Sequence, residues 1–407
     1  MHCGLLGRKL SHSYSPQIHN YLGNYSYELF EIEPDTLKTF LKTADFRGIN
    51  VTIPYKKDVI PFCDALSLCA EKVGAVNTII RNPDGRLIGY NTDYYGFQSM
   101  VKKSGLSLKS KKVLILGSGG ASATASVVLT ELGANAVVIS RNGTNNYTNL
   151  SRHQDASAII NCTPVGMYPN TDSTPIDLNL FPNLEGVLDL VYNPANTYLL
   201  QQARARKLIC ENGLWMLVAQ AKKAAELFTD SKIDDAIIAD IHRQLQNQMK
   251  NLVLVGMPGC GKTTIGKLLA EKAGRTFVDT DEQIERLAGI PIPAIFTEFG
   301  ENHFRSLETA VLSQFGKESG LIISTGGGCV TRQENYAHLH QNGTIIWLQR
   351  DLQKLATDGR PLSATGKLSV LYQQRLEHYK QFADIIIDNN GDTSTTVQQI
   401  EYALEDI

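Results

Sequence analysis

The chain has 407 residues, of which 43% are hydrophobic and 20% charged, and its formal net charge is −2 at pH 7. This composition is ordinary for a folded globular protein, and at about 150 residues per domain it indicates two or three domains. No run of one charge sign indicates nucleic acid or an anionic membrane as a partner. The apolar runs are strand-sized, well below the roughly 20 residues that span a bilayer, and the N-terminus lacks a secretory pattern, so we expect a cytoplasmic protein.

The seven cysteines are scattered along the chain and form no Cys-x-x-Cys pair. This spacing argues against a zinc site and predicts free thiols in a reducing compartment. Cys260 lies inside a glycine-rich segment, where we expect it to act as a small filler side chain.

Residues 1–95 alternate strand-like and helix-like stretches. We expect strands at 27–32 and 48–54, and a hairpin over 77–90 whose turn contains Pro83 and Gly85. A second unit begins near residue 96. Its apolar run at 111–116 leads through a glycine-rich turn into a helix and then into a strand at 136–140, the βαβ order of a dinucleotide-binding parallel sheet.

The glycine-rich turn and the end of the following strand carry the candidate dinucleotide contacts. These residues are Gly117, Ser118, Gly119, Gly120, Ala121, Ser140, Arg141 and Asn142. An acidic residue at the end of the second strand would bind the ribose 2′-hydroxyl of NAD, whereas Arg141 without an acid beside it suits the 2′-phosphate of NADP. We therefore predict NADP, and the alternative is an exposed arginine that contacts no ligand.

Residues 213–249 have the pattern of a helix, and the polar stretch near 244–250 marks the main domain boundary. A strand at 251–255 opens a third unit that runs to residue 407. Two nucleotide-binding αβ units in one chain predict an α/β protein with two parallel sheets, each covered by helices.

The segment after residue 255 fits the Gly-x4-Gly-Lys-Ser/Thr phosphate-binding pattern and leads into an amphipathic helix. It consists of Gly256, Met257, Pro258, Gly259, Cys260, Gly261, Lys262 and Thr263, followed by Thr264. The glycines let backbone N–H groups face the phosphates of a nucleoside triphosphate, and the helix N-terminus adds partial positive charge. We expect Lys262 at the β- and γ-phosphates and the Thr263 hydroxyl at Mg²⁺. A chance glycine-rich turn is the alternative.

Asp279 and Asp281 follow the strand-like residues 276–278. Beside a phosphate loop, one carboxylate can hold the metal shell while the other binds an acceptor hydroxyl. Capping of a helix N-terminus explains the same pair equally well.

Later features favour the catalytic interpretation. They are the segment 300–308 with Arg305 and Glu308, the triple glycine Gly326, Gly327 and Gly328, and Arg375 one helical turn before Tyr379. Together with the phosphate loop they make residues 251–407 resemble shikimate kinase, a P-loop domain of the nucleoside-monophosphate-kinase type with a parallel αβα arrangement.

The kinase resemblance implies a role for each matching residue. Asp279 lies near magnesium, and Asp281 contacts the acceptor hydroxyl. Arg305 and Arg375 bind the shikimate carboxylate, and the triple-glycine backbone closes around the ring. Arg360, in an Arg-Pro pair of the lid, approaches the phosphates. The chain departs from the family at 355–358, where the usual basic residue before the lid is missing, so lid closure or nucleotide affinity is expected to differ.

The first unit holds a second group of candidates. Residues 50–56 predict a strand that ends at Pro54 with Lys56 just beyond it, and ligands of open αβ sheets lie at such strand ends. Ser13 and Ser15 offer hydroxyls, and Asp93 follows the predicted hairpin. Taken singly, these residues are explained equally well as a surface lysine and as caps of helices.

Together these segments resemble shikimate dehydrogenase. The matching segments are 13–15, 50–56, 74–78, 91–93, 117–121, 161–167, 189–194 and 212–220. The resemblance implies that two serines, Ser13 and Ser15, bind the substrate carboxylate. It also implies that ring hydroxyls are held by Thr52, Asn77, Asp93 and Gln220, and that Tyr192 lies near the substrate. It implies a catalytic pair of Lys56 and Asp93 at the reacting oxygen, and it places Gly213 and Met216 near the nicotinamide.

The two resemblances predict a bifunctional enzyme. Residues 1–95 and 211–245 would form the substrate domain, residues 96–210 the Rossmann NADP domain, and residues 251–407 the kinase domain. The first half would reduce 3-dehydroshikimate with NADPH, and the second would phosphorylate shikimate with Mg-ATP. Two alternatives remain: a C-terminal module that only senses nucleotide, and an NAD-dependent quinate dehydrogenase in the first half.

Overall fold

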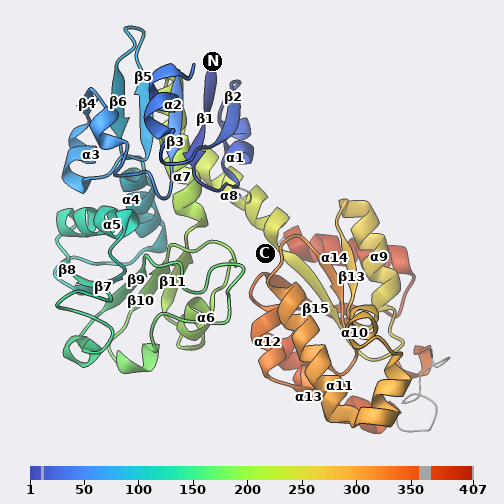
Figure 1. Ribbon diagram of the computed structural model, residues 1–407. Coiled ribbons are helices and arrows are strands. Elements are labelled where there is room, and N and C mark those ends of the chain that lie inside the picture. Colours follow the sequence, from blue (N-terminus) through green and yellow to red (C-terminus); the bar gives the residue numbers. More distant parts are fainter. Residues whose placement is uncertain (11–12, 357–367, 406–407) are drawn as a thin grey trace. The chain divides into compact units, whose positions relative to one another are not determined.

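The computed structural model describes residues 1–10, 13–356 and 368–405 (Figure 1). The chain divides into two compact units, one formed by Met1–Tyr192 with Leu199–Leu245 and the other by Asn193–Tyr198 with Gln246–Ile407. Within the described residues the first unit contains two β-sheets and the second contains one. None of the described helices combines the length and the apolar character that a membrane-spanning segment needs.

The first sheet of the first unit is mixed, with the strand order β2-β1-β3-β5-β6-β4. Its strands are β1 (His2–Gly7), β2 (Ser26–Glu31), β3 (Gly48–Val51), β4 (Ala65–Leu66), β5 (Thr78–Arg81) and β6 (Leu87–Tyr90). The helices of this region are α1 (Ser15–Leu22), α2 (Leu37–Thr43) and α3 (Leu68–Val73). β5 and β6 pair antiparallel, which confirms the predicted hairpin. β3 ends at Val51, earlier than predicted, because residues 53–58 turn and Pro54 has no N–H for a strand ladder.

The second sheet is parallel throughout, with the order β11-β10-β9-β7-β8. Its strands are β7 (Lys112–Leu116), β8 (Asn135–Ile139), β9 (Ala158–Asn161), β10 (Gly186–Asp189) and β11 (Ile209–Asn212). Helix α5 (Gly120–Glu131) joins β7 to β8, as the βαβ pattern predicted, and α6 (Tyr198–Ala205) precedes β11. The expected boundary between 210 and 211 falls inside β11, because Glu211 and Asn212 still pair with β10.

The prediction of one continuous helix over 213–249 is wrong. The structure has α7 (Leu214–Thr229) and α8 (Ala236–Met249), and α7 packs against α4 (Asp93–Ser104). The chain leaves α7 at Asp230, whose φ of 51° is left-handed, a conformation that short polar side chains tolerate. Buried Lys222 binds Asp235 at 2.7 Å and Glu226 at 2.6 Å and so holds the intervening turn.

The sheet of the second unit is also parallel, with the order β13-β14-β12-β15-β16. Its strands are β12 (Asn251–Val255), β13 (Phe277–Asp279), β14 (Ile322–Ser324), β15 (Gly343–Gln349) and β16 (Ile385–Asp388). Its helices are α9 (Lys262–Ala273), α10 (Thr280–Ala288), α11 (Ile292–Gly316), α12 (Glu334–Leu339), α13 (Leu368–Phe382) and α14 (Thr393–Glu405). Strand order reverses at β12, and such a switch point is where open αβ sheets bind ligands.

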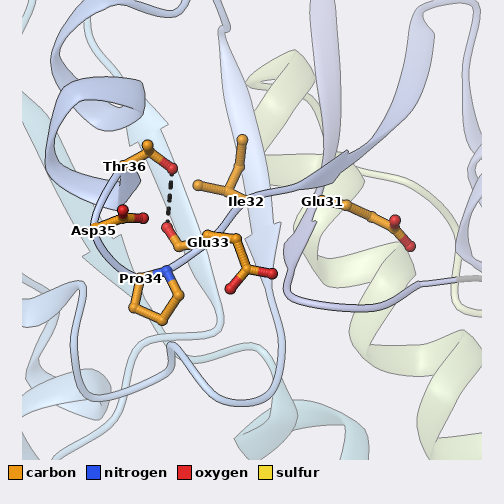
Figure 2. Close-up of a pocket in the computed structure, with 6 residues that line it drawn as sticks. All are labelled: Glu31, Ile32, Glu33, Pro34, Asp35 and Thr36. Atoms are coloured by element: carbon orange, nitrogen blue, oxygen red, sulfur yellow. Dashed lines mark hydrogen bonds between the residues drawn. The ribbon is translucent and has the colours of Figure 1, made fainter.

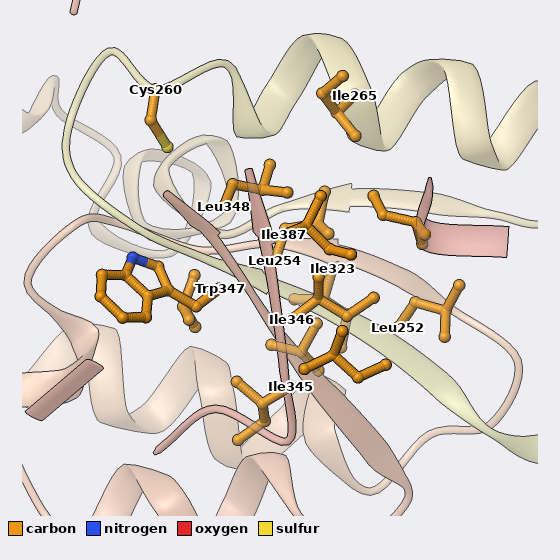
Figure 3. Packing of buried hydrophobic residues seen from close by; sticks show 14 of the residues in the cluster. Leu252, Leu254, Cys260, Ile265, Ile323, Ile345, Ile346, Trp347, Leu348 and Ile387 are labelled. Atoms are coloured by element: carbon orange, nitrogen blue, oxygen red, sulfur yellow. The ribbon is translucent and has the colours of Figure 1, made fainter. Parts of the chain in front are cut away.

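Buried aliphatic side chains of the central strands form the core of this unit (Figure 3). Ile265 of α9 and Cys260 of the phosphate loop pack into the same cluster, so helix and loop are fixed to the sheet. Trp347 of β15 stacks on Tyr379 of α13 with ring centroids 5.5 Å apart. The core therefore supports both sides of the predicted phosphate-binding loop.

Candidate active sites

The predicted catalytic pair of the first unit lies together. Lys56 Nζ is 2.5 Å from Asp93 Oδ2, and the two side chains are only 21% and 10% exposed. Lys56 follows β3, and Asp93 is the first residue of α4. The Lys56 Cδ atom is also 3.6 Å from the point that a Cβ on Gly120 would occupy, so the lysine borders the glycine-rich turn of the parallel sheet.

The predicted ring contacts Asn77 and Gln220 are joined by Thr92. Asn77 Oδ1 accepts the Thr92 N–H at 2.6 Å, Asn77 Nδ2 donates to Thr92 Oγ1 at 3.0 Å, and Thr92 Oγ1 donates to Gln220 Oε1 at 3.4 Å. Thr52 is half-buried and donates its N–H to the Leu6 carbonyl of β1. Thr52 directly follows β3, Asn77 directly precedes the antiparallel β5, and Gln220 lies in α7, so three of the predicted contacts come from two strand ends and a helix.

The predicted carboxylate ligands lie at the start of α1. Ser13 Oγ accepts the Ser15 N–H at 3.2 Å, although the helix begins at Ser15 without a side-chain cap. Tyr14 between them meets Tyr192 edge to face, with ring centroids 6.1 Å apart. Burial raises the pKa of Tyr192 to about 12, so its hydroxyl stays a hydrogen-bond donor at neutral pH.

The glycine-rich turn of the second sheet fits a dinucleotide. Gly117 has a φ of 107° and donates its N–H to Ile139 at the end of β8. A Cβ added at Gly119 would meet nothing within 4 Å, so the backbone before α5 is open to a ligand. Ser140, Arg141 and Asn142 follow Ile139 at the same sheet edge, and Arg141 is exposed.

Gly213 and Met216 lie at the start of α7. A Cβ on Gly213 would approach the Leu190 carbonyl oxygen to 2.1 Å, so only glycine fits there. Met216 is 8% exposed and packs in the core that also contains Leu188. Ser118 is exposed and Ala121 is half-buried. These four residues therefore lie at the ends of helices and strands that border the parallel sheet, and their contact with a cofactor stays a prediction.

The phosphate-binding loop has the backbone that the pattern predicts. Gly256, Gly259 and Gly261 have φ values of 146°, 83° and 100°, and α9 begins directly after Gly261. Lys262 Nζ donates to the carbonyls of Gly256 at 2.9 Å and Met257 at 3.1 Å, inside the curve of the loop. A lysine and a helix N-terminus converging on one loop form an anion site that fits the phosphates of ATP.

Asp279 caps a helix with one carboxylate oxygen and faces Thr263 with the other. Its Oδ1 accepts the Asp281 N–H at 3.0 Å and caps α10, and its Oδ2 accepts the Thr263 hydroxyl at 2.9 Å. Burial and the neighbouring Asp279 raise the pKa of Asp281. Within the described ranges no group of three or more His, Cys, Asp or Glu side chains forms a metal site. Thr263 and Asp279 are the predicted ligands that would hold Mg²⁺ together with phosphate oxygens.

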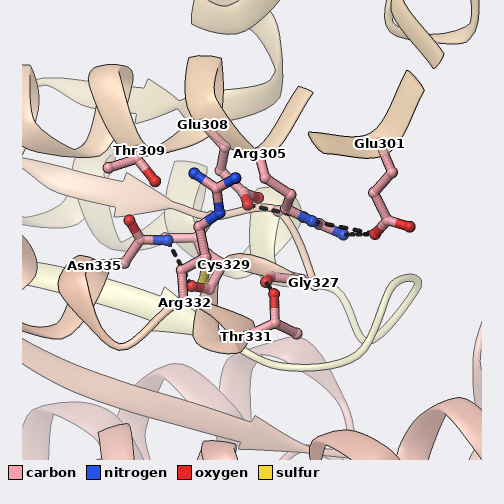
Figure 4. Close-up of polar contacts among 12 residues, drawn as sticks. Glu301, Arg305, Glu308, Thr309, Gly327, Cys329, Thr331, Arg332 and Asn335 are labelled. Atoms are coloured by element: carbon pink, nitrogen blue, oxygen red, sulfur yellow. Dashed lines mark hydrogen bonds and ion pairs between the residues drawn. The ribbon is translucent and has the colours of Figure 1, made fainter. Parts of the chain in front are cut away.

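The predicted shikimate-carboxylate ligand Arg305 lies between two glutamates (Figure 4). Its guanidinium binds Glu308 at 2.8 Å and Glu301 at 3.1 Å. Glu308 is fully buried, and this burial raises its pKa although Arg305 opposes the shift. Arg305 and Glu308 are one turn apart on α11, so their ion pair holds the Arg305 guanidinium in a defined orientation.

Arg375 and Tyr379, one turn apart on α13, both donate to the Gly327 carbonyl, at 3.0 Å and 2.6 Å. A Cβ on Gly327 would meet Pro258 of the phosphate loop at 2.6 Å. A Cβ on Gly326 would approach Glu308 Oε1 to 2.8 Å and Asp281 Oδ1 to 2.9 Å. Because glycines stand here, Pro258 of the phosphate loop can approach Gly327 closely, and Glu308 and Asp281 can approach Gly326.

Replacement of Gly328 by alanine should weaken shikimate binding. The added Cβ would lie 2.3 Å from Arg305 Nη2, so the guanidinium must move away from its predicted position at the shikimate carboxylate. We expect KM for shikimate to rise about tenfold, the equivalent of about 1.4 kcal/mol, with little change in KM for ATP. Steady-state kinetics measures both constants. Gly391→Ala is the control, because a Cβ there meets nothing within 4 Å, and equal changes in both constants would contradict the expectation.

Arg360 lies outside the described residues. Ala356, the last described residue before it, donates its N–H to the Gly259 carbonyl of the phosphate loop at 3.3 Å. Leu355 is buried in the core.

Sequence reasoning missed supporting residues on both sites. Asn389 Nδ2 donates to the Cys260 carbonyl at 2.5 Å and so fixes the phosphate loop from the end of β16. In the first unit Asn50 and Thr78 connect Tyr27 to Asn77. Asn50 and Thr78 stand in segments that matched the family, but their contacts come from strand pairing and no local pattern indicates them.

His19 of α1 is buried among aromatic rings. Its ring stacks on Tyr27 at 3.9 Å, and its Nδ1 bonds the Tyr25 hydroxyl at 2.6 Å. Burial lowers the pKa of His19 from 6.5 to about 3. Between these two pH values His19 is therefore neutral in the folded protein and protonated in the unfolded chain.

This shift predicts acid sensitivity of the first unit. Between pH 6.5 and about 3 the unfolded state binds more protons at His19, so stability falls as the pH falls. The expected slope from this residue is at most about 1.4 kcal/mol per pH unit. The His19→Phe variant should show a smaller change of unfolding free energy with pH. Urea unfolding at several pH values measures this free energy, with protease cleavage within residues 1–245 reporting the unfolding of the first unit. Parallel pH curves for the two proteins would exclude His19 as the cause.

A surface pocket of about 630 Å³ is lined by none of these residues (Figure 2). Glu31, Ile32, Glu33, Pro34, Asp35 and Thr36 line it. Two of its carboxylates already have protein partners, since Glu31 accepts the Leu10 N–H at 2.6 Å and Glu33 pairs with Arg8 at 3.0 Å. It contains no predicted contact of either site.

The two sites define two enzyme classes. A parallel sheet with a glycine-rich turn beside a lysine–aspartate pair is typical of a nicotinamide-dependent oxidoreductase. A phosphate loop beside an aspartate pair and converging arginines is typical of a kinase for a small anionic acceptor.

Comparisons with known proteins agree with this division. The shikimate dehydrogenase substrate binding domain model matches residues 5–79, and the shikimate kinase model matches residues 258–405. The chain is 36% identical over 268 residues to the shikimate dehydrogenase (NADP(+)) of Clostridium beijerinckii, a match that covers 61% of this chain and 98% of that protein. The chain thus belongs to the shikimate dehydrogenase family and carries a shikimate kinase domain at its C-terminal end.

Solved structures resemble the first unit. Shikimate dehydrogenase 1 from Peptoclostridium difficile has 37% identity and a TM-score of 0.56, over 60% of this chain and 97% of that one. Shikimate 5-dehydrogenase from Thermus thermophilus, in complex with NADP(H) and shikimate, has 32% identity and a TM-score of 0.55, over 60% of this chain and 99% of that one. These likenesses confirm the predicted fold of the first half.

Proposed function

We propose that the chain catalyses two consecutive reactions on one small ring. The first unit reduces 3-dehydroshikimate to shikimate with NADPH, and the second phosphorylates shikimate at its 3-hydroxyl with Mg-ATP. The single observation that carries this proposal is the presence of both reaction centres in one chain, Lys56 with Asp93 and Lys262 with Asp279 and Asp281. The product of the first reaction is the acceptor of the second.

In the reduction, NADPH supplies the hydride when it is bound. As the ketone oxygen of the substrate gains negative charge, the Lys56 ammonium stabilises it and donates the proton that completes the alcohol. Asp93 holds Lys56 through their 2.5 Å contact. Ser13 and Ser15 would orient the ring by its carboxylate.

In the phosphoryl transfer, the acceptor hydroxyl oxygen attacks the γ-phosphorus as the bond to the bridging oxygen of ADP breaks. Asp281 accepts the proton of that hydroxyl. Lys262 neutralises charge on the transferring group, and Thr263 with Asp279 would hold the magnesium shell. Arg305 and Arg375 would bind the acceptor carboxylate, because guanidinium pairs well with carboxylate.

We assign three functional domains to these roles: residues 1–95 with 211–245 for the dehydrogenase substrate, 96–210 for NADP, and 251–407 for the kinase. Strand pairing favours moving the boundary after 210 to Asn212, where β11 ends. We also propose a cytoplasmic location, which suits a protein with seven free cysteines.

A coupled assay tests the proposed function. The full chain is given 3-dehydroshikimate, NADPH and Mg-ATP, and we expect NADPH oxidation, ADP formation and shikimate 3-phosphate. A chain that oxidises NADPH but forms no ADP with added shikimate would have a nucleotide-sensing C-terminal module instead. Parallel assays with NAD and quinate separate the remaining alternative, which predicts faster turnover with NAD.

A further inference from the structure

A continuous chain of hydrogen bonds runs behind the substrate contacts of the first unit. The Tyr27 hydroxyl donates to Asn50 Oδ1 at 2.7 Å, and Asn50 Nδ2 donates to Thr78 Oγ1 at 3.0 Å. Thr78 Oγ1 donates in turn to Asn77 Oδ1 at 3.1 Å. Asn50, Thr78 and Asn77 are 5%, 0% and 3% exposed, so water does not replace these bonds.

Each hydrogen bond in this series has a defined donor and acceptor. Burial of the Tyr27 hydroxyl raises its pKa well above 10, so the phenol remains protonated and acts as donor. The Asn50 oxygen is then held toward Tyr27 and its amide nitrogen toward Thr78, so the Thr78 hydroxyl donates onward, to Asn77 Oδ1 at 3.1 Å, with Thr92 Oγ1 slightly farther at 3.2 Å. Asn77 Oδ1 also accepts the Thr92 N–H at 2.6 Å. Its oxygen is therefore saturated, and its Nδ2 has one hydrogen for Thr92 and one for a ligand.

The first member of the chain is held by an aromatic stack. His19 lies on Tyr27 with an interplanar angle of 11°, and Phe228 of α7 stacks on His19 at 5.6 Å. His19 and Ser15 lie one turn apart on α1, and both are buried. The helix that offers the predicted carboxylate ligand thus also fixes the start of the hydrogen-bond chain.

We propose that Tyr27, Asn50 and Thr78 are positioning residues that orient Asn77 as a hydrogen-bond donor to a ring hydroxyl of the substrate. They make the substrate site selective for a ring that carries a hydroxyl at the point that Asn77 contacts. A site built to hydrogen-bond a hydroxyl rejects an analogue without it, because its own polar group is then left unpaired. This inference rests on the proposed dehydrogenase function.

Tyr27→Phe tests the first link, because it removes the hydroxyl and keeps the stacked ring. We expect KM for 3-dehydroshikimate to rise about three- to tenfold, the range for one lost hydrogen bond, while KM for NADPH stays unchanged. The preference for 3-dehydroshikimate over a ring analogue that lacks the hydroxyl should fall by the same factor. Tyr90→Phe is the matched control, since its ring packs in the same cluster and its hydroxyl makes no hydrogen bond within the described part of the chain.

A second pair of variants covers the case in which Tyr27→Phe folds poorly. Thr78→Val breaks the chain at its next link with nearly the same shape, and Thr78→Ser restores the hydroxyl and should restore KM. If the residues act as one chain, the double variant Y27F/T78V is no worse than the more damaging single variant. Additive losses, or wild-type selectivity in folded Thr78→Val, would overturn the inference. Failure of the wild-type chain to reduce 3-dehydroshikimate would instead refute the proposed function itself.

Discussion

Replacement of Lys56 by alanine is expected to abolish NADPH oxidation with 3-dehydroshikimate and to leave phosphorylation of added shikimate intact. The ammonium is the proposed proton donor to the reacting oxygen, and loss of such a group typically costs about 10²–10⁴-fold in rate. Because Asp93 is 10% exposed, its carboxylate would then lack its partner at 2.5 Å. Initial rates of NADPH oxidation and of ADP formation, measured on one preparation, report both activities.

Lys57→Ala is the matched control for this variant, because Lys57 is exposed and adjacent in sequence. It should retain both activities. A folded Lys56→Ala protein that still reduced 3-dehydroshikimate at the wild-type rate would exclude Lys56 as the proton donor. Loss of both activities in a folded protein would contradict the assignment of two separate reaction centres.

Lys262→Ala is the reciprocal change and should eliminate the kinase. Its ammonium lies inside the phosphate loop, within 3.1 Å of two loop carbonyls, where it would neutralise the transferring phosphoryl group. Removal of one preorganised donor of this kind costs at least about 10²-fold in kcat. The dehydrogenase should keep its wild-type rate, measured by NADPH oxidation in the absence of ATP.

Lys267→Ala provides the control, because Lys267 is exposed on the same helix, α9. Retention of shikimate-dependent ADP formation by folded Lys262→Ala would show that the loop lysine does not act in transfer. A protein in which Lys267→Ala caused the same loss would indicate that α9 itself had been disturbed.

The parts of the site that follow from local geometry were predictable. The phosphate loop needs only a strand, a fixed glycine spacing and a helix, and all three lie within residues 251–273. Arg305 with Glu308, and Arg375 with Tyr379, share helical spacing that the sequence displays directly.

Contacts between strands and helices far apart in the sequence were harder to predict. Lys56 and Asp93 are 37 residues apart, and only the family resemblance joined them before their 2.5 Å contact was seen. The path from Tyr27 through Asn50 to Asn77 depends on the register of β1 between β2 and β3. That register results from pairing between strands, and the residue preferences of a single segment do not determine it.

The helix break at Asp230 was missed for a different reason. Residues 213–249 contain no proline and no glycine after Gly213, so the usual breaking residues are absent. The turn is held instead by buried Lys222, whose two carboxylate partners come from opposite sides of it. Here tertiary charge pairing decided against local helix propensity.

The stack of Trp347 on Tyr379 has a practical consequence. The chain has two tryptophans, Trp215 in α7 beside Met216 and Trp347 in β15. Tyr379 in turn holds the Gly327 carbonyl next to the proposed shikimate site. Each of the two units therefore contains one tryptophan, and a single Trp-to-Phe change would leave tryptophan fluorescence from the other unit alone.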